Sequence, residues 1–375
     1  MADYPNQDAT NTLIEQIATA SGQGERLVIT GHGSKQFYGQ APAGTPLETA
    51  GHCGIIDYEP GDLVLRARAG TPLTQIEAVL AEQGQCLGFE PPRFAVQGAA
   101  RGTLGGAVAA GLSGPRRPWV GSTRDFVLGV TMVNGLGHSL YFGGQLIKNV
   151  AGFDVPRLMA GSLGTLGLLL DVTIRVLPIR PAEVTLQLQL SGSEALQRMV
   201  EWQRRPLPLS GMVYRDDRLT IRLSGTPEGV AAAQEAIGGE RLESADEWWA
   251  SLRDQRPSFF NPENSLWRVS CAAAAVLPEI AGDWTIDWGG AQRWYQGDAT
   301  AAELLDYAKK INGSLSRFRP GTTQTSSEPI VFLSEISDPV AAIHQRLKKA
   351  FDPDGLFDGS RLPVAGIDQT STVLV

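Results

Sequence analysis

Glycine clusters are the feature of this chain whose residue types and spacing best indicate a chemical role. Between positions 102 and 167 the sequence reads GTLGGAVAAGLSG, then Lys148 and Asn149, then GSLGTLG, with short β-patterned segments between them. Another glycine pair flanks His32 in TGHGSK. Glycines leave backbone N–H groups open to close approach, which suits a large anionic cofactor lying along the chain.

Two common phosphate-binding loops are excluded. The sequence around Gly31 and Gly33 carries Gln36 where a Rossmann fingerprint needs its third glycine. No Gly-Lys-Ser or Gly-Lys-Thr occurs anywhere, so nucleoside triphosphate chemistry is disfavoured. Each cluster alone is typical of a tight turn, and only their ordered combination is specific.

Composition favours a cytoplasmic enzyme of two domains, or three if a terminal piece stands apart. The chain has 375 residues, of which 42% are hydrophobic and 19% charged, and a net charge of -8. That charge offers no basic patch for nucleic acid. No apolar run is long enough to span a membrane, and the first residues lack the pattern of a signal peptide.

The cysteines do not predict a metal site. Cys53, Cys86 and Cys271 are widely separated and include no CxxC pair. They cannot by themselves supply the four thiolates of an iron–sulfur cluster, so we expect three reduced thiols, mostly buried.

The first third of the chain reads as β-α units. Residues 26–30 predict a short strand that runs into the turn at 31–35, and residues 63–69 predict a half-buried strand. A helix is expected next, capped by Thr71, with Pro72 in its first position and Gly84 at its end.

A hairpin and a long strand complete the predicted N-terminal domain. The apolar run at 126–133 meets Asn134-Gly135 and continues to 142, which is a strong hairpin signal. A strand at 168–177 ends at two prolines, the second of them Pro181, and we place a domain boundary there. This gives a first domain of residues 1–181.

The second region, 182–345, has a different sequence pattern from the first. Its alternating strands and helices predict an antiparallel sheet with helices on one face, here called the cap domain. The strands are expected at 184–190 and 217–223, and the helices at 193–202 and 227–237. Six of the eight tryptophans fall between Trp248 and Trp294, so aromatic surface is concentrated in this region. Residues 346–375 are expected to return to the first domain.

The order of these motifs resembles that of the vanillyl-alcohol oxidase and D-2-hydroxy-acid dehydrogenase superfamily, whose members carry a PCMH-type FAD-binding domain. Within it, the chain is most similar to the FAD-binding subunits of glycolate oxidase. The resemblance lies in TGHGSKQFYG at 30–39, AGTPLTQIEAVLAEQG at 69–84, GTLGGAVAAGLSGPRRPWVGSTRDFVLG at 102–129, GGQLIKNVAGFDVPRLMAGSLGTLG at 143–167 and FDPDGLFDGSRL at 351–362. It implies an α+β fold, in which a PCMH-type FAD-binding domain of two subdomains is joined to an antiparallel-sheet α+β cap.

The resemblance also implies a set of cofactor-contacting residues. The 31–35 loop would hold the pyrophosphate of FAD through its backbone amides, and Lys148 with Asn149 would lie near the isoalloxazine ring. Some relatives attach FAD through a histidine where this chain has Ser34, so noncovalent FAD is expected. The residues that match are Gly31, His32, Gly33, Ser34, Lys35, Thr103, Leu104, Gly105, Gly106, Ser113, Gly114, Gly121, Asp125, Lys148, Asn149, Gly164, Thr165 and Gly167.

The sequence departs from the catalytic members of this superfamily in its histidines. Those members use cap histidines to hold a metal and to take the substrate proton, but three of the four histidines here lie in the first domain. The fourth, His344, is expected at a helix surface or boundary, on a helix whose apolar face is Ile343, Leu347 and Phe351. Arginines could still bind a carboxylate in a bidentate fork, and the candidates are Arg268, Arg293, Arg317 and Arg319. Catalytic candidates are thus limited to Lys148, Arg268 and Arg293, and no metal is expected.

The resemblance implies an FAD-binding subunit of a glycolate oxidase complex that converts glycolate to glyoxylate, with this chain serving electron relay or assembly. Its implied partners are a homologous catalytic FAD subunit and an iron–sulfur subunit, and any contact with the membrane would come through them. Two alternatives stay open at this point. One is a self-sufficient FAD-dependent 2-hydroxy-acid dehydrogenase, and the other is a non-enzymatic structural subunit with a vestigial flavin groove.

Overall fold

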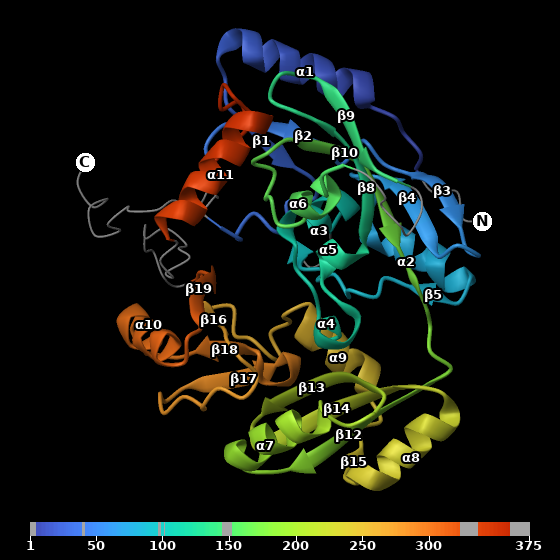
Figure 1. The fold of residues 1–375 in the computed structure, drawn as a ribbon, viewed down its shortest axis with the longest axis vertical. Coiled ribbons are helices and arrows are strands. Elements are labelled where there is room, and N and C mark those ends of the chain that lie inside the picture. Colours follow the sequence, from blue (N-terminus) through green and yellow to red (C-terminus); the bar gives the residue numbers. More distant parts are fainter. Residues whose placement is uncertain are drawn as a thin grey trace.

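Two large sheets organise the chain, one in each half of the molecule (Figure 1). The computed structural model describes residues 5–39, 42–96, 99–100, 102–144, 152–322 and 337–360. Within these ranges, no helix is both long and apolar enough to cross a membrane. The combination of helices with antiparallel sheets confirms the α+β class expected from the sequence.

The sheet of the N-terminal half has five strands in the order β3-β4-β10-β8-β9, and every neighbouring pair is antiparallel. Its central strand, β10, is buried along almost its whole length and packs with several helices in one core. The predicted strand at 63–69 and the predicted hairpin are both confirmed. The elements are β3 (Ile55–Glu59), β4 (Val64–Arg68), β8 (Val127–Val133), β9 (Ser139–Gly143) and β10 (Leu168–Arg175), with α2 (Leu73–Glu82), α3 (Leu104–Ala110) and α6 (Val155–Met159).

A smaller parallel pair, β1 (Leu27–Thr30) and β2 (Thr45–Glu48), lies beside this sheet and is covered by α1 (Thr10–Gln23). Short elements connect the rest of the N-terminal half. They are β5 (Gln85–Cys86), β6 (Ala95–Val96), β7 (Ala99–Ala100), α4 (Arg117–Val120), α5 (Thr123–Phe126) and β11 (Leu177–Pro178).

Two local predictions in this half need correction. Thr71 does not cap α2; its hydroxyl instead accepts from the Gly54 amide at 2.9 Å and donates to the Arg68 carbonyl at 2.7 Å. The turn between β8 and β9 is longer than an Asn-Gly pair, because the Asn134 side chain accepts from the His138 amide at 2.9 Å. In both cases a side chain organises a loop that local spacing does not reveal.

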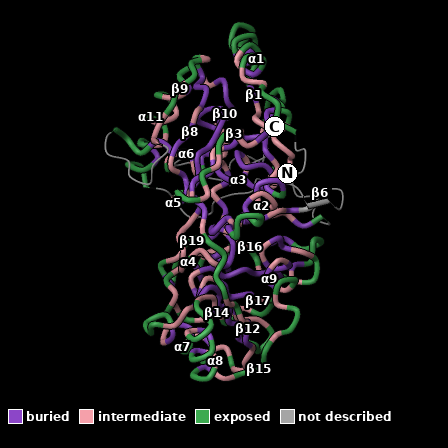
Figure 2. The backbone as a smooth tube through the Cα atoms, turned by 90° about the vertical axis from the view of Figure 1, so that its right-hand side faces the viewer, coloured by how far each residue is buried: buried purple, intermediate pink, exposed green. Residues whose placement is uncertain are grey.

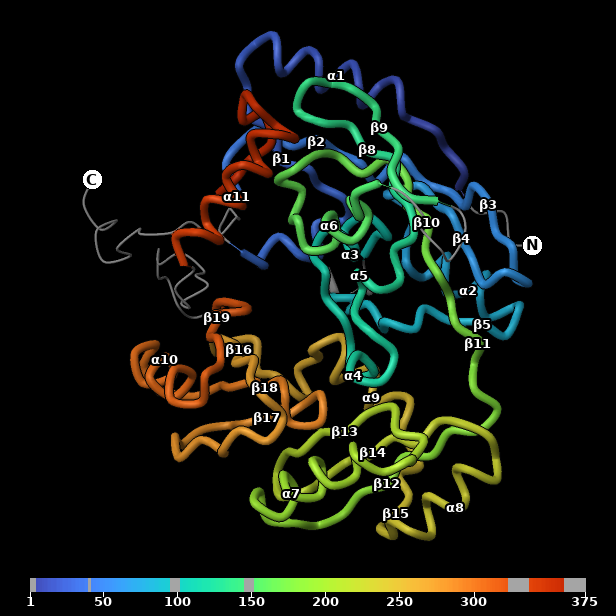
Figure 3. The backbone as a smooth tube through the Cα atoms, viewed as in Figure 1, coloured from blue at the N-terminus to red at the C-terminus, as the bar shows by residue number. Residues whose placement is uncertain are grey.

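The cap sheet has eight strands in the order β15-β12-β14-β13-β17-β18-β16-β19, and each neighbouring pair of strands is antiparallel. Figure 3 shows the chain entering this sheet after β11. The strands are β12 (Ala182–Gln189), β13 (Leu209–Arg215), β14 (Arg218–Gly225), β15 (Glu240–Arg241), β16 (Leu266–Ser270), β17 (Asp283–Asp287), β18 (Gln292–Gln296) and β19 (Ser314–Arg319). Its helices are α7 (Gly192–Trp202), α8 (Pro227–Ile237), α9 (Ala245–Arg253), η1 (Trp288–Gly290) and α10 (Ala301–Lys310).

The expectation that the cap helices share one face of the sheet is wrong. Met212 on β13 packs in the core formed with α7 and α8, whereas the next residue, Val213, packs with Trp249 of α9. Because successive side chains of a strand point to opposite faces, α9 covers the opposite side from α7 and α8. That side faces the N-terminal half (Figure 1).

Aromatic side chains fill the junction between the two halves. Phe318 of β19 contacts Tyr38 and Trp294, with each pair of ring centroids 5.0 Å apart, and Phe37 at 5.7 Å. Buried backbone runs through both halves in Figure 2. Much of the aromatic surface predicted for the cap is therefore buried at this junction, where ring contacts stabilise the docking of the cap on the N-terminal half.

The C-terminal segment, as far as residue 360 where its description ends, contacts the N-terminal half after α11 (Asp338–Phe351), and the predicted boundary at 345 falls inside that helix. Beyond α11, the Asp358 amide donates to the Leu27 carbonyl at 3.0 Å. The Lys348 ammonium donates to the carbonyls of Thr165, at 2.7 Å, and Phe357, at 2.6 Å, and pairs with the fully buried carboxylate of Asp352.

Replacing Lys348 should therefore detach this segment. We expect Lys348→Met to lower the free energy of unfolding by about 3 kcal/mol, because it leaves a buried carboxylate without its cation. Urea titration followed by far-UV circular dichroism measures the loss. Lys349→Met, which changes the exposed neighbour, should unfold like the parent, and equal losses in the two variants would contradict this role for Lys348.

Candidate functional site

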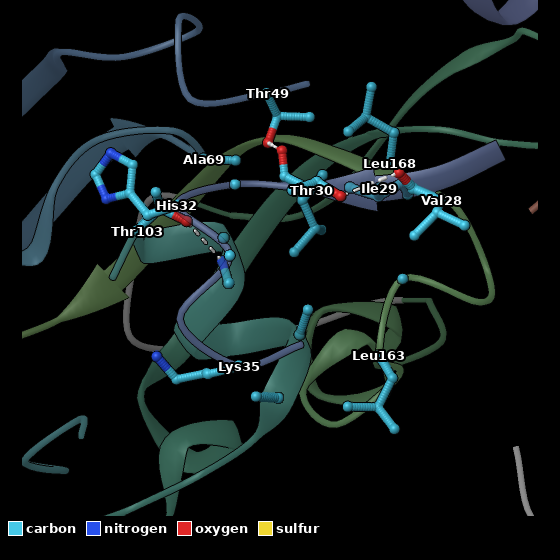
Figure 4. A pocket seen from close by; sticks show the side chains of 18 of the residues that line it. Val28, Ile29, Thr30, His32, Lys35, Thr49, Ala69, Thr103, Leu163 and Leu168 are labelled. Carbon is cyan, nitrogen blue, oxygen red and sulfur yellow. Dashed lines mark hydrogen bonds between the residues drawn. The ribbon is translucent and has the colours of Figure 1, made fainter. Parts of the chain in front are cut away.

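A cavity with about 860 Å³ of empty space opens where β1 ends, between the 31–36 loop, α3 and the segment 162–169 (Figure 4). Glycines contribute to three of its walls, as the sequence predicts for a ligand that approaches the backbone closely. Of the predicted cofactor residues, it is lined by Gly31, His32, Gly33, Ser34, Lys35, Thr103, Gly105, Gly106, Gly164 and Gly167.

The 31–35 loop offers bare backbone donors. Within the described residues, the amides of Gly31, Gly33, Ser34 and Lys35 have no hydrogen-bond acceptor. Gly33 has φ +69°, which a side chain would strain, and a Cβ on Gly31 would lie 2.8 Å from the Thr103 hydroxyl oxygen. Consecutive unpaired amides in a tight loop form an anion-binding concavity.

Lys35 adds a cation that is not neutralised locally. Its ammonium nitrogen is buried and has no hydrogen-bond acceptor in the part of the chain that the structure describes, and it lies 5.5 Å from the centre of the Phe94 ring. Burial lowers the pKa of Lys35 to about 8, an effect that the more distant Asp254 partly opposes. A buried ammonium without an acceptor is unfavourable, so an anionic group in this cavity would relieve the penalty.

Helix α3 contributes a wall but few free donors. The amides of Leu104 and Gly105 donate to the carbonyls of Thr71, at 3.0 Å, and Ala69, at 2.8 Å. The amide of Gly106 donates to the Thr103 hydroxyl at 3.1 Å. The expectation of bare amides therefore fits the 31–35 loop and not the start of α3, where glycine serves close packing instead.

The third wall is the 162–169 segment. Gly164 has φ +76°, and a Cβ on Gly167 would lie 2.7 Å from the carbonyl oxygen of Val133. Thr165 points away from the cavity and donates to the Ser162 carbonyl at 2.7 Å. Like Leu104, which is fully buried in the core, Thr165 shapes the wall without lining the cavity.

The other predicted cofactor residues lie elsewhere. Ser113 and Gly114 line a separate small cavity that reaches Trp294. Asp125 accepts from the Ser122 amide at 2.8 Å and so caps α5, and a Cβ on Gly121 would lie 3.1 Å from that carboxylate. Lys148 and Asn149 fall outside the described residues.

A second cavity, with about 1500 Å³ of empty space, lies between the two halves. It shares Ala110, Ser162 and Leu163 with the first, so the two adjoin. Arg268 and Tyr38 line it, and so does Arg117, which the sequence reasoning missed because nothing in its local pattern marks it.

His344 also lines this second cavity, at the boundary of the helix where the sequence allowed it to lie. It is half-buried, and its Nδ1 atom has no hydrogen-bond partner among the described residues. Of the predicted apolar face of α11, Leu347 lines the cavity and Phe351 packs against the N-terminal core, whereas Ile343 is 48% exposed. The spacing of His344, Leu347 and Lys348, three or four residues apart, would have indicated the inward face.

The arginine candidates differ in whether they line the cavity between the halves. Arg293 is fully buried and donates to the carbonyls of Ala275, Val276 and Gly290, which leaves it little to offer a substrate. Neither Arg317 nor Arg319 lines the cavity between the halves. Arg268 alone of the four does.

Comparisons with known proteins agree with these features. Residues 8–143 match the family model described as "FAD binding domain". The glycolate oxidase subunit GlcE of Escherichia coli (strain K12) is 42% identical over 95% of this chain and 97% of its own length. A D-2-hydroxyglutarate dehydrogenase of Xanthomonas citri pv. viticola is 32% identical over 44% of this chain and 34% of its own length.

Among solved structures, an alkyldihydroxyacetonephosphate synthase superposes on 92% of this chain and 74% of its own, with a TM-score of 0.63 and 14% identity. At that identity the likeness concerns the fold alone. It extends over both halves of the molecule, so the cap shares it.

The contact between α3 and residue 69 can be tested by adding one methyl group to α3 at Gly105. A Cβ on Gly105 would lie 2.6 Å from the Cβ of Ala69, so Gly105→Ala should lower the free energy of unfolding by about 1–3 kcal/mol despite the better helix propensity of alanine. Gly22→Ala in α1 meets no atom within 4 Å and should be neutral or stabilising. Urea titration compares the two, and a stabilising Gly105→Ala would show that the contact does not constrain α3.

Proposed function

The chain belongs to the family of the glycolate oxidase subunit GlcE, and from this membership we propose that it is the FAD-binding subunit of a glycolate oxidase complex, which oxidises glycolate to glyoxylate. The observation that carries the proposal is the glycine-lined cavity beside the bare amides of the 31–35 loop, with Lys35 in its lining and a buried ammonium on that side chain that has no acceptor among the described residues. FAD carries a pyrophosphate, and its two negative charges suit this ammonium together with the bare amides of the 31–35 loop.

The residues present fit a noncovalent dinucleotide. Gly31 and Gly105 leave the space that a side chain would close, and Gly33 supplies the backbone conformation of the loop. Ser34 has no nucleophilic ring nitrogen, so the cofactor stays dissociable. When bound, FAD supplies a two-electron acceptor for hydride.

We propose that this chain relays electrons or supports assembly of the complex. Alcohol oxidation by hydride transfer needs a base for the hydroxyl proton, and no histidine occurs between His138 and His344. The cap domain, proposed as residues 182–345, therefore brings only His344, which lies on the returning helix α11. We assign proton abstraction to a companion subunit.

The relatives' names describe subunits of glycolate oxidase, GlcE and GlcD, and the chain accordingly works within a multi-subunit enzyme. The finer composition is part of the proposal: a homologous catalytic FAD subunit and an iron–sulfur subunit that carries electrons onward. Cys53, Cys86 and Cys271 include no CxxC pair, which agrees with a cluster held by another chain. A cytoplasmic location, with membrane contact only through partners, completes the proposal.

Co-expression tests this assignment. The chain should purify with visible flavin absorbance, and glycolate turnover should appear only when the companion subunits are present. Full turnover by the isolated chain would overturn the relay role and favour a self-sufficient dehydrogenase. A colourless chain that does not take up added FAD would leave only a structural role.

The charge of Lys35 gives a further expected outcome. Lys35→Met should weaken FAD binding by about 10- to 100-fold, the loss expected for one charge-assisted hydrogen bond. The control is Lys310→Met, which removes an exposed lysine of the cap and should bind FAD as the parent does. Fluorescence titration of the apoprotein with FAD measures both affinities, and equal affinities would contradict a pyrophosphate contact by Lys35.

The same contact predicts a pH dependence. The lowered pKa of about 8 means that the ligand-free protein loses this positive charge as the pH rises through 8, whereas a bound anion would retain the proton. FAD affinity should therefore be level below that pH and fall above it. In Lys35→Met this decline should be absent.

A further inference from the structure

The described walls of the cofactor cavity come from the N-terminal half. Its described lining residues all lie between Val28 and Leu169, and none comes from the cap. Phe37 and Tyr38, which follow the 31–35 loop, nevertheless touch the cap, because both rings pack against Phe318 of β19. The cap can therefore act on the cavity through contacts beside the loop, without lining it.

Arg93 and Phe94 contact both the cap and the region of the cofactor loop. The Arg93 amide donates to the carboxylate of Asp254, in the cap, at 2.9 Å. The Phe94 ring, one residue further on, lies 5.5 Å from the Lys35 ammonium, and its centroid lies 5.2 Å from that of Phe37. An ammonium is attracted to the face of an aromatic ring. This two-residue segment therefore connects a cap carboxylate to side chains on and beside the 31–35 loop.

The Asp254 carboxylate is held firmly at the junction between the halves. It follows the last residue of α9, is buried, and accepts two hydrogen bonds from the Arg253 guanidinium, each at 2.8 Å. The Arg93 guanidinium donates to Glu77 of α2 at 2.8 Å and lies 3.9 Å from Asp254. Buried pairs of this kind resist displacement, because the loss of one partner leaves the other charge uncompensated.

The charges around Arg93 are unequal in number. Lys35, Arg93 and Arg253 supply three positive charges, whereas Asp254 and Glu77 supply two negative ones. Burial lowers the pKa of Lys35, and the negative charge of Asp254 opposes part of that effect. Asp254 thus favours the charged form of Lys35, which is the form that attracts an anionic cofactor.

We propose that Asp254 of the cap is a positioning residue for the cofactor loop. It fixes Arg93 and Phe94, through them it holds the Lys35 side chain in place, and it puts a negative charge near the Lys35 ammonium. The cap thereby sets the FAD affinity of a cavity that none of its described residues lines. The inference rests on the proposed function, since it takes this cavity to be the FAD site.

The test separates the charge of Asp254 from its hydrogen bonds. Asp254→Asn keeps an oxygen that can accept from the Arg93 amide but loses the charge, whereas Asp254→Ala loses both. Glu77→Gln is the matched control, because Glu77 pairs with the same Arg93 guanidinium from the side of the N-terminal half. Isotope labelling of the lysine Cε carbons lets NMR follow the titration of Lys35 in the full chain without FAD. The chain has only six lysines, and Lys35→Met identifies the signal.

In the parent chain we expect Lys35 to titrate with a pKa of about 8. Asp254→Asn should lower this pKa by about 0.5 or more, because removal of a nearby negative charge disfavours the ammonium. Glu77→Gln should leave the pKa of Lys35 unchanged.

Fluorescence titration of the FAD-free variants then gives FAD affinity against pH. In Asp254→Asn the affinity should begin to fall at a lower pH than in the parent, in step with the lowered pKa of Lys35. At about pH 6, where Lys35 is charged in each variant, Asp254→Ala should bind FAD about 3- to 10-fold more weakly than Asp254→Asn, as for one lost hydrogen bond. If Asp254→Ala does not fold by circular dichroism, Asp254→Asn decides the matter.

Three results would each overturn the proposal. They are a Lys35 pKa that is the same in Asp254→Asn as in the parent, FAD affinity that is unchanged at every pH in the Asp254 variants, and a Glu77→Gln variant that lowers the Lys35 pKa as far as Asp254→Asn does. Failure of the proposed function is a separate observation, because a chain that takes up no FAD still reports the titration of Lys35.

Discussion

The close contact of helix α3 with the chain at residues 69–71 is the constraint on which the rest of the site depends. The Gly105 amide donates to the Ala69 carbonyl at 2.8 Å, and the Leu104 amide donates to that of Thr71. Only glycine allows this approach, because a Cβ on Gly105 would collide with Ala69. The contact fixes α3 as the floor of the cofactor cavity, opposite a loop whose own amides remain free. One glycine-rich segment therefore provides packing and the other leaves free amides for the proposed cofactor, although the two look alike in sequence.

The cap completes the site by docking rather than by supplying a cofactor wall. Aromatic rings at the junction, centred on Phe318, hold the cap sheet against Tyr38 and Phe37. A hydrogen bond from the Trp288 indole to the Gly114 carbonyl, 3.0 Å long, adds a directional contact across the same junction. Because α9 lies on the inner face of the sheet, Arg93 and Asp254 meet there as well. The cavity between the halves is thus a product of docking, and neither half could form it alone.

Sequence reasoning predicted the fold class, the longest strands of the N-terminal sheet and the loop around Gly33, because periodicity and glycine spacing report local backbone demands. It could not place side chains that meet through tertiary packing. The pattern of α11 allowed His344 a surface or boundary place, but it could not show that the docked helix lines a cavity there while Ile343 stays exposed. Arg117 and Arg268 are far apart in sequence, and no local pattern connects them. For Arg293, sequence could not show that three carbonyls would satisfy it.

The two adjoining cavities are both lined by positively charged side chains. The chain carries a net charge of -8, yet Lys35, Arg117 and Arg268 line these cavities without a carboxylate partner among the described lining residues. Acidic side chains nearby are engaged elsewhere: Asp254 pairs with Arg253, and Glu90 pairs with Arg222. Cations that are desolvated and unpaired destabilise the protein until an anion arrives. Several unpaired cations in one continuous region make that region the most attractive one for anions, because the rest of the surface is acidic. The free energy lost in burying Lys35 would be recovered if the proposed cofactor's pyrophosphate bound beside it, which favours the first cavity as a ligand site.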